Sequence, residues 1–209
     1  MPSKFRVRYI FKPLVMRIAK GLAKIKISPN MATGIMLLNA IVSFLFLVCF
    51  QNLFLFAIFV FTTGMFDGVD GAIARLTNTE SSFGGFFDSF MDRISEFIIL
   101  LALLIHFWNE VLWNIIDLKF IIIITLIASI MFSYSRGRAE ALFKGDFDVG
   151  LMARSERLFY IFITMLIAHF IGRGEYFLFL FMILVVLSAL YRGVNIYLQI
   201  RKYAKNSED

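Results

Sequence analysis

The stretch DGVDGAIARLTNTESSFGGFFDSFMDR, residues 67–93, carries four aspartates and two arginines between two segments that are almost entirely apolar. Charged groups are costly inside a hydrocarbon layer, so a cluster of them in an apolar chain indicates a functional site. The stretch therefore raises two questions, how the apolar segments around it fold and what its carboxylates bind.

The composition predicts an all-α integral membrane protein. Of the 209 residues, 60% are hydrophobic and 17% are charged, and the mean hydropathy is +0.81; a soluble domain carries about 25% charged residues. The apolar residues form blocks of about 20, the length that spans a bilayer as a helix. We expect six transmembrane helices, at about 33–51, 53–74, 85–106, 117–136, 155–172 and 176–198. Residues 1–30 then form a juxtamembrane segment, 31–200 the membrane domain, and 201–209 a polar cytoplasmic tail. The single cysteine, Cys49, excludes an internal disulfide framework.

The basic residues predict the orientation of these helices. If the N-terminus is cytoplasmic, 19 of the 21 lysines and arginines lie inside, and Lys119 and Arg173 lie outside. Both termini are therefore expected in the cytoplasm. From Pro13 onward the first 30 residues form a basic amphipathic pattern, which predicts a helix on the inner membrane surface. The basic residues are spread over several inner loops, so the partner of this charge is lipid and not nucleic acid.

The four aspartates form two pairs with helical spacing. Asp67 and Asp70 are three residues apart, and Asp88 and Asp92 are four apart, so each pair shares one face of a helix. A short loop joins the two helices into a hairpin that can bring the pairs together. Each charge within a span costs about 2.5–3.5 kcal/mol, so a cation has to compensate. Oxygen ligands favour hard divalent ions, and four carboxylates can hold two ions of Mg²⁺ or Mn²⁺. The alternatives are pairing with Arg75 and Arg93, or plain solvation among the headgroups.

Residues 67–92 read D-x-x-D-G-x-x-A-R-x8-G-x-x-x-D-x-x-x-D, which resembles the signature of the CDP-alcohol phosphotransferase family. The resemblance implies a metal-dependent phosphatidyltransferase with six spans and an amphipathic N-terminal helix, commonly a homodimer. It implies that the aspartates hold two metal ions and that Asp92 takes the proton of the incoming hydroxyl. It also implies CDP-lipid contacts by residues of the signature and of the segment SPNMAT (28–33), namely Asn30, Thr33, Gly71, Arg75 and Ser81.

The acceptor alcohol has to be inferred from other polar residues. Arg136, Arg154 and Arg192 lie at the cytoplasmic ends of the last three spans, and three converging arginines would suit a phosphate dianion. The alternative is that they only obey the positive-inside rule. The segments FGGFFDSFMDR, YSRGRAE and ARSER (83–93, 134–140 and 153–157) are similar to those of phosphatidylinositol phosphate synthases. This resemblance implies transfer from CDP-diacylglycerol or CDP-archaeol to inositol phosphate with release of CMP. Glycerol-3-phosphate as acceptor and a divalent-cation transporter are the alternatives, and His106 and His169 are given no role.

Overall fold

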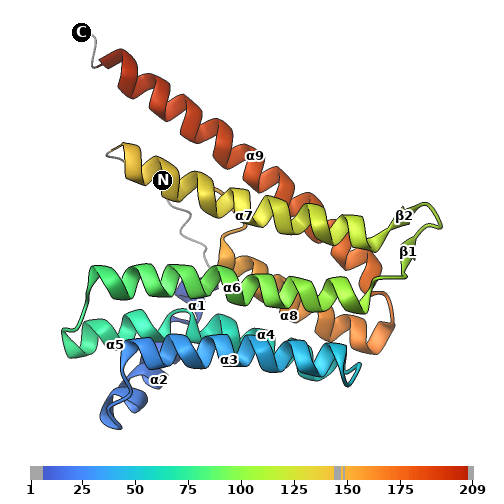
Figure 1. The fold of residues 1–209 in the computed structure, drawn as a ribbon, viewed down its shortest axis with the longest axis horizontal. Helices are drawn as coiled ribbons and strands as arrows, with labels where there is room; N and C mark the ends of the chain where they lie inside the picture. The colour runs from blue at the N-terminus through green and yellow to red at the C-terminus, as the bar shows by residue number, and fades with distance from the viewer. Residues whose placement is uncertain (1–6, 144–146, 148, 207–209) are drawn as a thin grey trace.

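The computed structural model describes residues 7–143, 147 and 149–206. Its elements in chain order are α1 (Val7–Ile10), α2 (Lys12–Lys24), α3 (Pro29–Val48), α4 (Leu53–Phe66), α5 (Val69–Thr77), α6 (Ser82–His106), β1 (Val111–Leu112), β2 (Ile116–Asp117), α7 (Leu118–Leu142), α8 (Arg154–Ile171) and α9 (Gly174–Asn206). The long helices lie lengthwise beside one another (Figure 1). The predicted helical membrane fold is therefore confirmed.

Local sequence explains where several helices begin. Ser28 caps α3 by accepting the Met31 N–H at 3.3 Å, and Pro29 follows at the first helical position. Asn52 caps α4 by accepting the Leu55 N–H at 2.9 Å, and Ser81 caps α6 by accepting the Gly84 N–H at 3.0 Å. These caps set the register of the helices that carry the predicted site residues.

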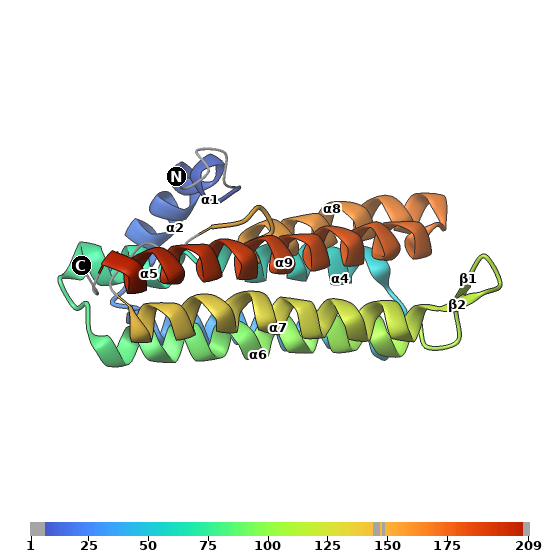
Figure 2. The same ribbon diagram turned by 90° about the horizontal axis from the view of Figure 1, so that it is seen from above.

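The helices pack into a bundle with one connected apolar core. α3 contacts α4 and α6, α8 lies against α4 and α9, and α7 pairs with α9. The core is built from buried side chains of all six of these helices, among them Leu47, Phe56, Leu103, Leu118 and Phe181. Figure 2 shows α1 and α2 to one side of the long helices. There α2 packs on α5, with Ala19 buried against Val69, Ala72 and Ile73.

Four helices are long and apolar enough to cross a membrane: Pro29–Val48, Leu53–Thr77, Leu118–Leu142 and Gly174–Lys202. Helices α6 and α8 have 25 and 18 residues but carry several charged residues in their first halves, such as Asp92 and Arg154. The count of six spans therefore stays a prediction.

Some boundaries differ from those expected. α6 begins at Ser82, three residues early, α7 continues to Leu142 beyond the expected end at 136, and α9 continues to Asn206. Hydropathy marks where a segment leaves the hydrocarbon, whereas a helix continues into water until its backbone is capped or broken. The two-stranded hairpin β1–β2 was not predicted; it turns through Trp113 and Asn114, whose φ angles are 53° and 56°.

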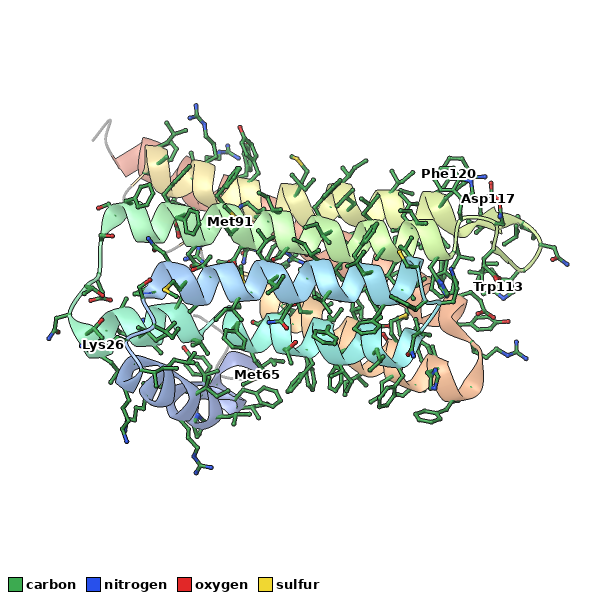
Figure 3. The ribbon with its side chains drawn as sticks, turned by 60° about the horizontal axis from the view of Figure 1, so that its bottom comes forward. Lys26, Met65, Met91, Trp113, Asp117 and Phe120 are labelled. Carbon is green, nitrogen blue, oxygen red and sulfur yellow. The ribbon has the colours of Figure 1, made fainter. Side chains whose placement is uncertain are left out.

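The bundle has two distinct ends. The α2–α3 turn at Lys26 lies at one end, and Trp113, Asp117 and Phe120 lie at the other (Figure 3). The α5–α6 connection and the last turns of α7 and α9 are at the Lys26 end, as Figure 1 shows. The helix ends nearest to Asn30, Ser81 and Arg136 therefore lie toward the same end of the bundle.

Candidate metal and nucleotide site

The aspartate pairs flank a break and a turn in the chain. α4 ends at Phe66, Asp67 is its C-terminal cap, and α5 restarts at Val69 after Gly68. Asn78, in the left-handed conformation with φ 52°, ends α5, and Ser81 starts α6. Because the connection is so short, α6 runs back past the α4–α5 junction and carries its own aspartates toward it.

Three of the four aspartates converge. Asp67, Asp88 and Asp92 each offer a carboxylate oxygen, and these oxygens lie within 4.8 Å of one another. The Oδ1 atom of Asp88 is buried and has no hydrogen-bond partner among the described residues. A buried carboxylate oxygen without a donor fits a cation ligand, and an all-oxygen set fits Mg²⁺ or Mn²⁺. The predicted convergence of the helical pairs is thus observed for these three residues.

Asp70 is held differently from the other three. Its side chain is buried, Oδ2 accepts the Thr33 hydroxyl at 2.7 Å, and Oδ1 accepts the Gly71 N–H at 2.6 Å. Thr33, one of the predicted nucleotide contacts, therefore orients a predicted metal ligand. The sequence does not indicate this contact, because 37 residues separate Thr33 from Asp70.

An arginine from α8 binds within the cluster of aspartates. Arg154 donates from Nη1 to the carboxylates of both Asp67 and Asp92, and from Nη2 to Ser95 Oγ at 2.6 Å. The alternative pairing with Arg75 and Arg93 is not what the structure shows. Arg93 donates to the Ser89 carbonyl one turn earlier on its own helix, and the Arg75 guanidinium lies beside Gly71. Arg154 therefore compensates part of the negative charge of the aspartates. From the sequence it was predicted only as a ligand of the acceptor phosphate.

Two cavities meet at the carboxylates, and together they include every predicted CDP contact. One, of about 580 Å³, is lined by Asn30, Thr33, Gly71 and Ser81. The other, of about 570 Å³, is lined by Arg75 and by apolar residues of α2, α4 and α8. Asp70 and Asp88 line both. The Arg75 guanidinium lies close to Gly71, since a Cβ there would be in contact with Nη1 at 3.4 Å.

The other two predicted acceptor arginines have different surroundings. Arg136, on α7, donates from Nε to Glu140 at 2.7 Å, and both side chains are about 40% exposed. Arg192, on α9, is 2% exposed and donates to the carbonyls of Val149 and, at 3.2 Å, Phe132. Its guanidinium carbon is 3.5 Å from the centre of the Phe132 ring. Each of the three predicted arginines is therefore fixed by its own set of contacts.

A buried ion pair in the site was missed at the level of sequence. Arg157 binds Glu96 through two hydrogen bonds of 2.5 and 2.7 Å, and the Arg157 side chain is fully buried. The signal was present, because a charged residue within an apolar span is expected to have a partner. Glu96 also follows Asp92 by four residues and Arg157 follows Arg154 by three, so each lies on the same helix face as a site residue.

Comparison with known proteins places this site in a family. Residues 26–201 match the model of the CDP-alcohol phosphatidyltransferase family. The chain is 40% identical over 167 residues to archaetidylinositol phosphate synthase of Pyrococcus horikoshii, covering 79% of this chain and 82% of that protein. It is 29% identical over 150 residues to phosphatidylinositol phosphate synthase of Cutibacterium acnes, covering 68% and 67%.

Solved structures of the same family are similar to this chain. The phosphatidylinositol phosphate synthase of Mycobacterium tuberculosis with CDP-DAG bound superimposes with a TM-score of 0.74 at 26% identity, over 88% of this chain and 94% of that one. The same enzyme in complex with manganese and citrate gives a TM-score of 0.76, over 88% of each chain. The chain therefore belongs to the CDP-alcohol phosphatidyltransferase family of metal-dependent membrane enzymes.

Proposed function

We propose that this protein transfers a phosphatidyl-type group from a CDP-lipid to inositol phosphate and releases CMP. The observation that carries the proposal is the convergence of Asp67, Asp88 and Asp92 beside the cavity lined by the nucleotide-contact residues. The names of the relatives support inositol phosphate as acceptor, and CDP-DAG bound to the Mycobacterium enzyme supports the donor.

The aspartates have two jobs in this reaction. Asp67, Asp70, Asp88 and Asp92 hold two divalent ions, Mg²⁺ or Mn²⁺, and metal bound there supplies positive charge to the pyrophosphate and the leaving CMP. Asp92 also accepts the proton of the acceptor hydroxyl. The acceptor oxygen forms a bond to the lipid-side phosphorus, and the bond from that phosphorus to the CMP oxygen breaks.

The two cavities suit the two parts of the donor. Asn30, Thr33, Gly71 and Ser81 present polar atoms or open backbone to the cytidine and its phosphates, and Arg75 grips phosphate through its planar fork. The cavity containing Arg75 continues along apolar side chains such as Phe61 and Leu158, which suits a lipid chain. The lipid is CDP-diacylglycerol or CDP-archaeol, since both present a CDP headgroup on apolar chains.

The acceptor is proposed to bind through its phosphate. Arg154 lies at the carboxylates already. In this proposal Arg136 and Arg192, which bind Glu140 and backbone carbonyls in the structure, join it to form a set of three cations for one dianion. Because these arginines recognise the phosphate and not the polyol ring, glycerol-3-phosphate is the second candidate acceptor.

The proposal includes the arrangement in the membrane. α6 and α8 complete six spans with the four apolar helices, α2 lies at the inner surface, and both termini and the site face the cytoplasm. The excess of lysine and arginine in the segments expected on the cytoplasmic side supports this orientation. The family resemblance supports a homodimer.

The deciding experiment measures CMP release by the purified protein in nanodiscs with CDP-archaeol or CDP-diacylglycerol and Mn²⁺. Inositol phosphate, glycerol-3-phosphate and serine are compared as acceptors. We expect release that depends on inositol phosphate and that falls about 10³-fold or more in Asp92→Asn, since both a base and a metal ligand are lost. Asp117→Asn, a half-buried carboxylate paired with Lys119 at the opposite end, is the control and should leave the rate unchanged.

Other outcomes identify the alternatives. CMP release that responds only to glycerol-3-phosphate overturns the acceptor assignment. Absence of CMP release with every alcohol, together with ion flux in liposomes that is lost in Asp92→Ala, would show a divalent-cation transporter instead.

A further inference from the structure

The Glu96–Arg157 ion pair lies next to the aspartate cluster, one helical turn further along α6 and α8. On α6, Glu96 follows Asp92 by four residues, and on α8, Arg157 follows Arg154 by three. Arg154 binds Asp92, and Arg157 binds Glu96. Two ionic links therefore join α6 to α8 about one helical turn apart, the first at the proposed metal site and the second deeper in the bundle.

The deeper link is better fixed than the first. Arg157 makes two parallel hydrogen bonds to Glu96, the side chains are 0% and 8% exposed, and a third bond of 2.7 Å runs from Arg157 Nη1 to the Met152 carbonyl. Met152 lies in the segment that leads into α8, two residues before Arg154. The Arg157 side chain thus ties the start of the helix that carries Arg154 to the helix that carries Asp92.

The Arg157 guanidinium also packs near an aromatic ring of α7. It lies 5.4 Å from the centre of the Phe132 ring of α7, the ring against which Arg192 of α9 packs at 3.5 Å. Gly150, with a φ of 114°, lets the segment before α8 pass close to this ring, because a Cβ there would lie 2.9 Å from Phe132 Cε2. Arg157 and Arg192 therefore share one aromatic support.

Stability alone does not explain why a charged pair occupies this position. Removing two charges from water is costly, and replacing a buried ion pair by apolar residues is often neutral or stabilising. What the pair adds is geometry, because the main neighbours of α8 are α4 and α9, whereas Arg157 reaches across to α6.

We infer that Glu96 and Arg157 are positioning residues, which hold Arg154 at the distance from Asp92 that the acceptor phosphate requires. Neither residue contacts substrate in this assignment. The inference rests on the proposed function, since it assumes that Arg154 binds the phosphate of the molecule whose hydroxyl Asp92 deprotonates.

The test replaces the pair by apolar residues in one double variant, Glu96→Leu/Arg157→Met, in the full-length protein. We expect the melting temperature to change little and kcat/KM for inositol phosphate to fall about 100-fold, as for a misplacement of about 1 Å. The KM for CDP-lipid should stay within about threefold of wild type, because the nucleotide contacts lie on other elements. The matched control is Asp117→Leu/Lys119→Met, which removes the 3.0 Å ion pair at the opposite end and should change neither constant.

A second set of variants disturbs the packing of Arg157 and Arg192 on Phe132 without removing a charge. Gly150→Ala forces the segment before α8 away from Phe132 and is expected to raise the KM for inositol phosphate, but not that for CDP-lipid. Two controls are needed: Gly174→Ala, whose Cβ would lie 2.7 Å from Phe107 at the other end, matches the steric conflict, and Gly172→Ala, at a φ of 69°, matches the backbone strain. If the double variant does not fold, Gly150→Ala and Arg157→Lys carry the test by the same comparison of the two KM values.

A third measurement does not depend on turnover. Loosening Arg154 should strengthen Mn²⁺ binding in the double variant, in the same direction as Arg154→Gln. A folded double variant with wild-type Mn²⁺ affinity and wild-type kcat/KM for the acceptor overturns the inference, as do equal rises of both KM values. Failure of the proposed function is distinguishable, because the wild-type protein itself would then show no CMP release that depends on a phosphorylated acceptor.

Discussion

Arg154 and Asp92 bind each other across 62 residues of sequence, and the same Arg154 nitrogen, Nη1, also donates to Asp67. The guanidinium therefore uses carboxylate oxygens that a divalent ion would also use. A cation from the chain and a cation from solution compete for the same ligands. An acceptor phosphate that takes over the Arg154 hydrogen bonds would therefore raise the affinity for metal, and bound metal would raise the affinity for the phosphate by the same factor.

Arg154→Gln is expected to tighten Mn²⁺ binding about tenfold, because it removes a partly buried competing charge. Mn²⁺ affinity of the substrate-free protein, followed by electron paramagnetic resonance, checks this. Arg173→Gln, an arginine near Tyr176 at the opposite end of the bundle, serves as control and should leave the affinity unchanged. Weaker Mn²⁺ binding in Arg154→Gln would contradict the competition.

The aspartate cluster should make the melting temperature depend on bound metal. Mn²⁺ at about 100 times its Kd is expected to raise the melting temperature by about 5 °C or more, because it binds the folded state alone. In Asp88→Asn the metal-free protein should melt at a higher temperature, since one of the converging negative charges is gone, and most of the Mn²⁺ shift should disappear. Asp117→Asn should show the full wild-type shift. An undiminished shift in Asp88→Asn would exclude this residue as a ligand.

The Thr33 hydroxyl is expected to matter through Asp70. Thr33→Val keeps the shape of the side chain but removes the 2.7 Å hydrogen bond to the carboxylate, so the Mn²⁺ concentration for half-maximal CMP release should rise about tenfold. The matched control is Thr125→Val, a buried threonine whose hydroxyl bonds the Ile121 carbonyl within its own helix. Equal effects of the two substitutions would mean that the Thr33 contact serves packing and not the site.

The proposed orientation can be tested with the natural cysteine. Cys49 is exposed at the end of α3, away from the carboxylates, so a membrane-impermeant maleimide should label it in intact cells. In a Cys49→Ser background, Ser82→Cys at the start of α6 should be labelled only after the cells are permeabilised. The reverse pattern would place the site outside the cell.

The sequence alone determined the features that depend on local spacing. Apolar blocks of about 20 residues fixed the helices, and spacings of three and four residues placed the carboxylates on common helix faces. Because Asp67, Asp70, Asp88 and Asp92 lie in one hairpin with a short turn, their convergence needs little information from the rest of the chain. The nucleotide contacts stay a prediction, which rests on the resemblance of residues 67–92 and of the separate segment 28–33 to a family signature.

The tertiary structure decided what these carboxylates meet. Nothing local to Arg154, Glu96 or Arg157 shows that α8 lies within side-chain reach of α6, because that depends on how every helix packs around the common core. The end of each apolar block likewise did not reveal where its helix stops, as α7 shows by continuing to Leu142. Local periodicity fixes which residues share a face, whereas long-range packing fixes which faces meet, and the pairing of Arg154 with Asp92 belongs to the second kind.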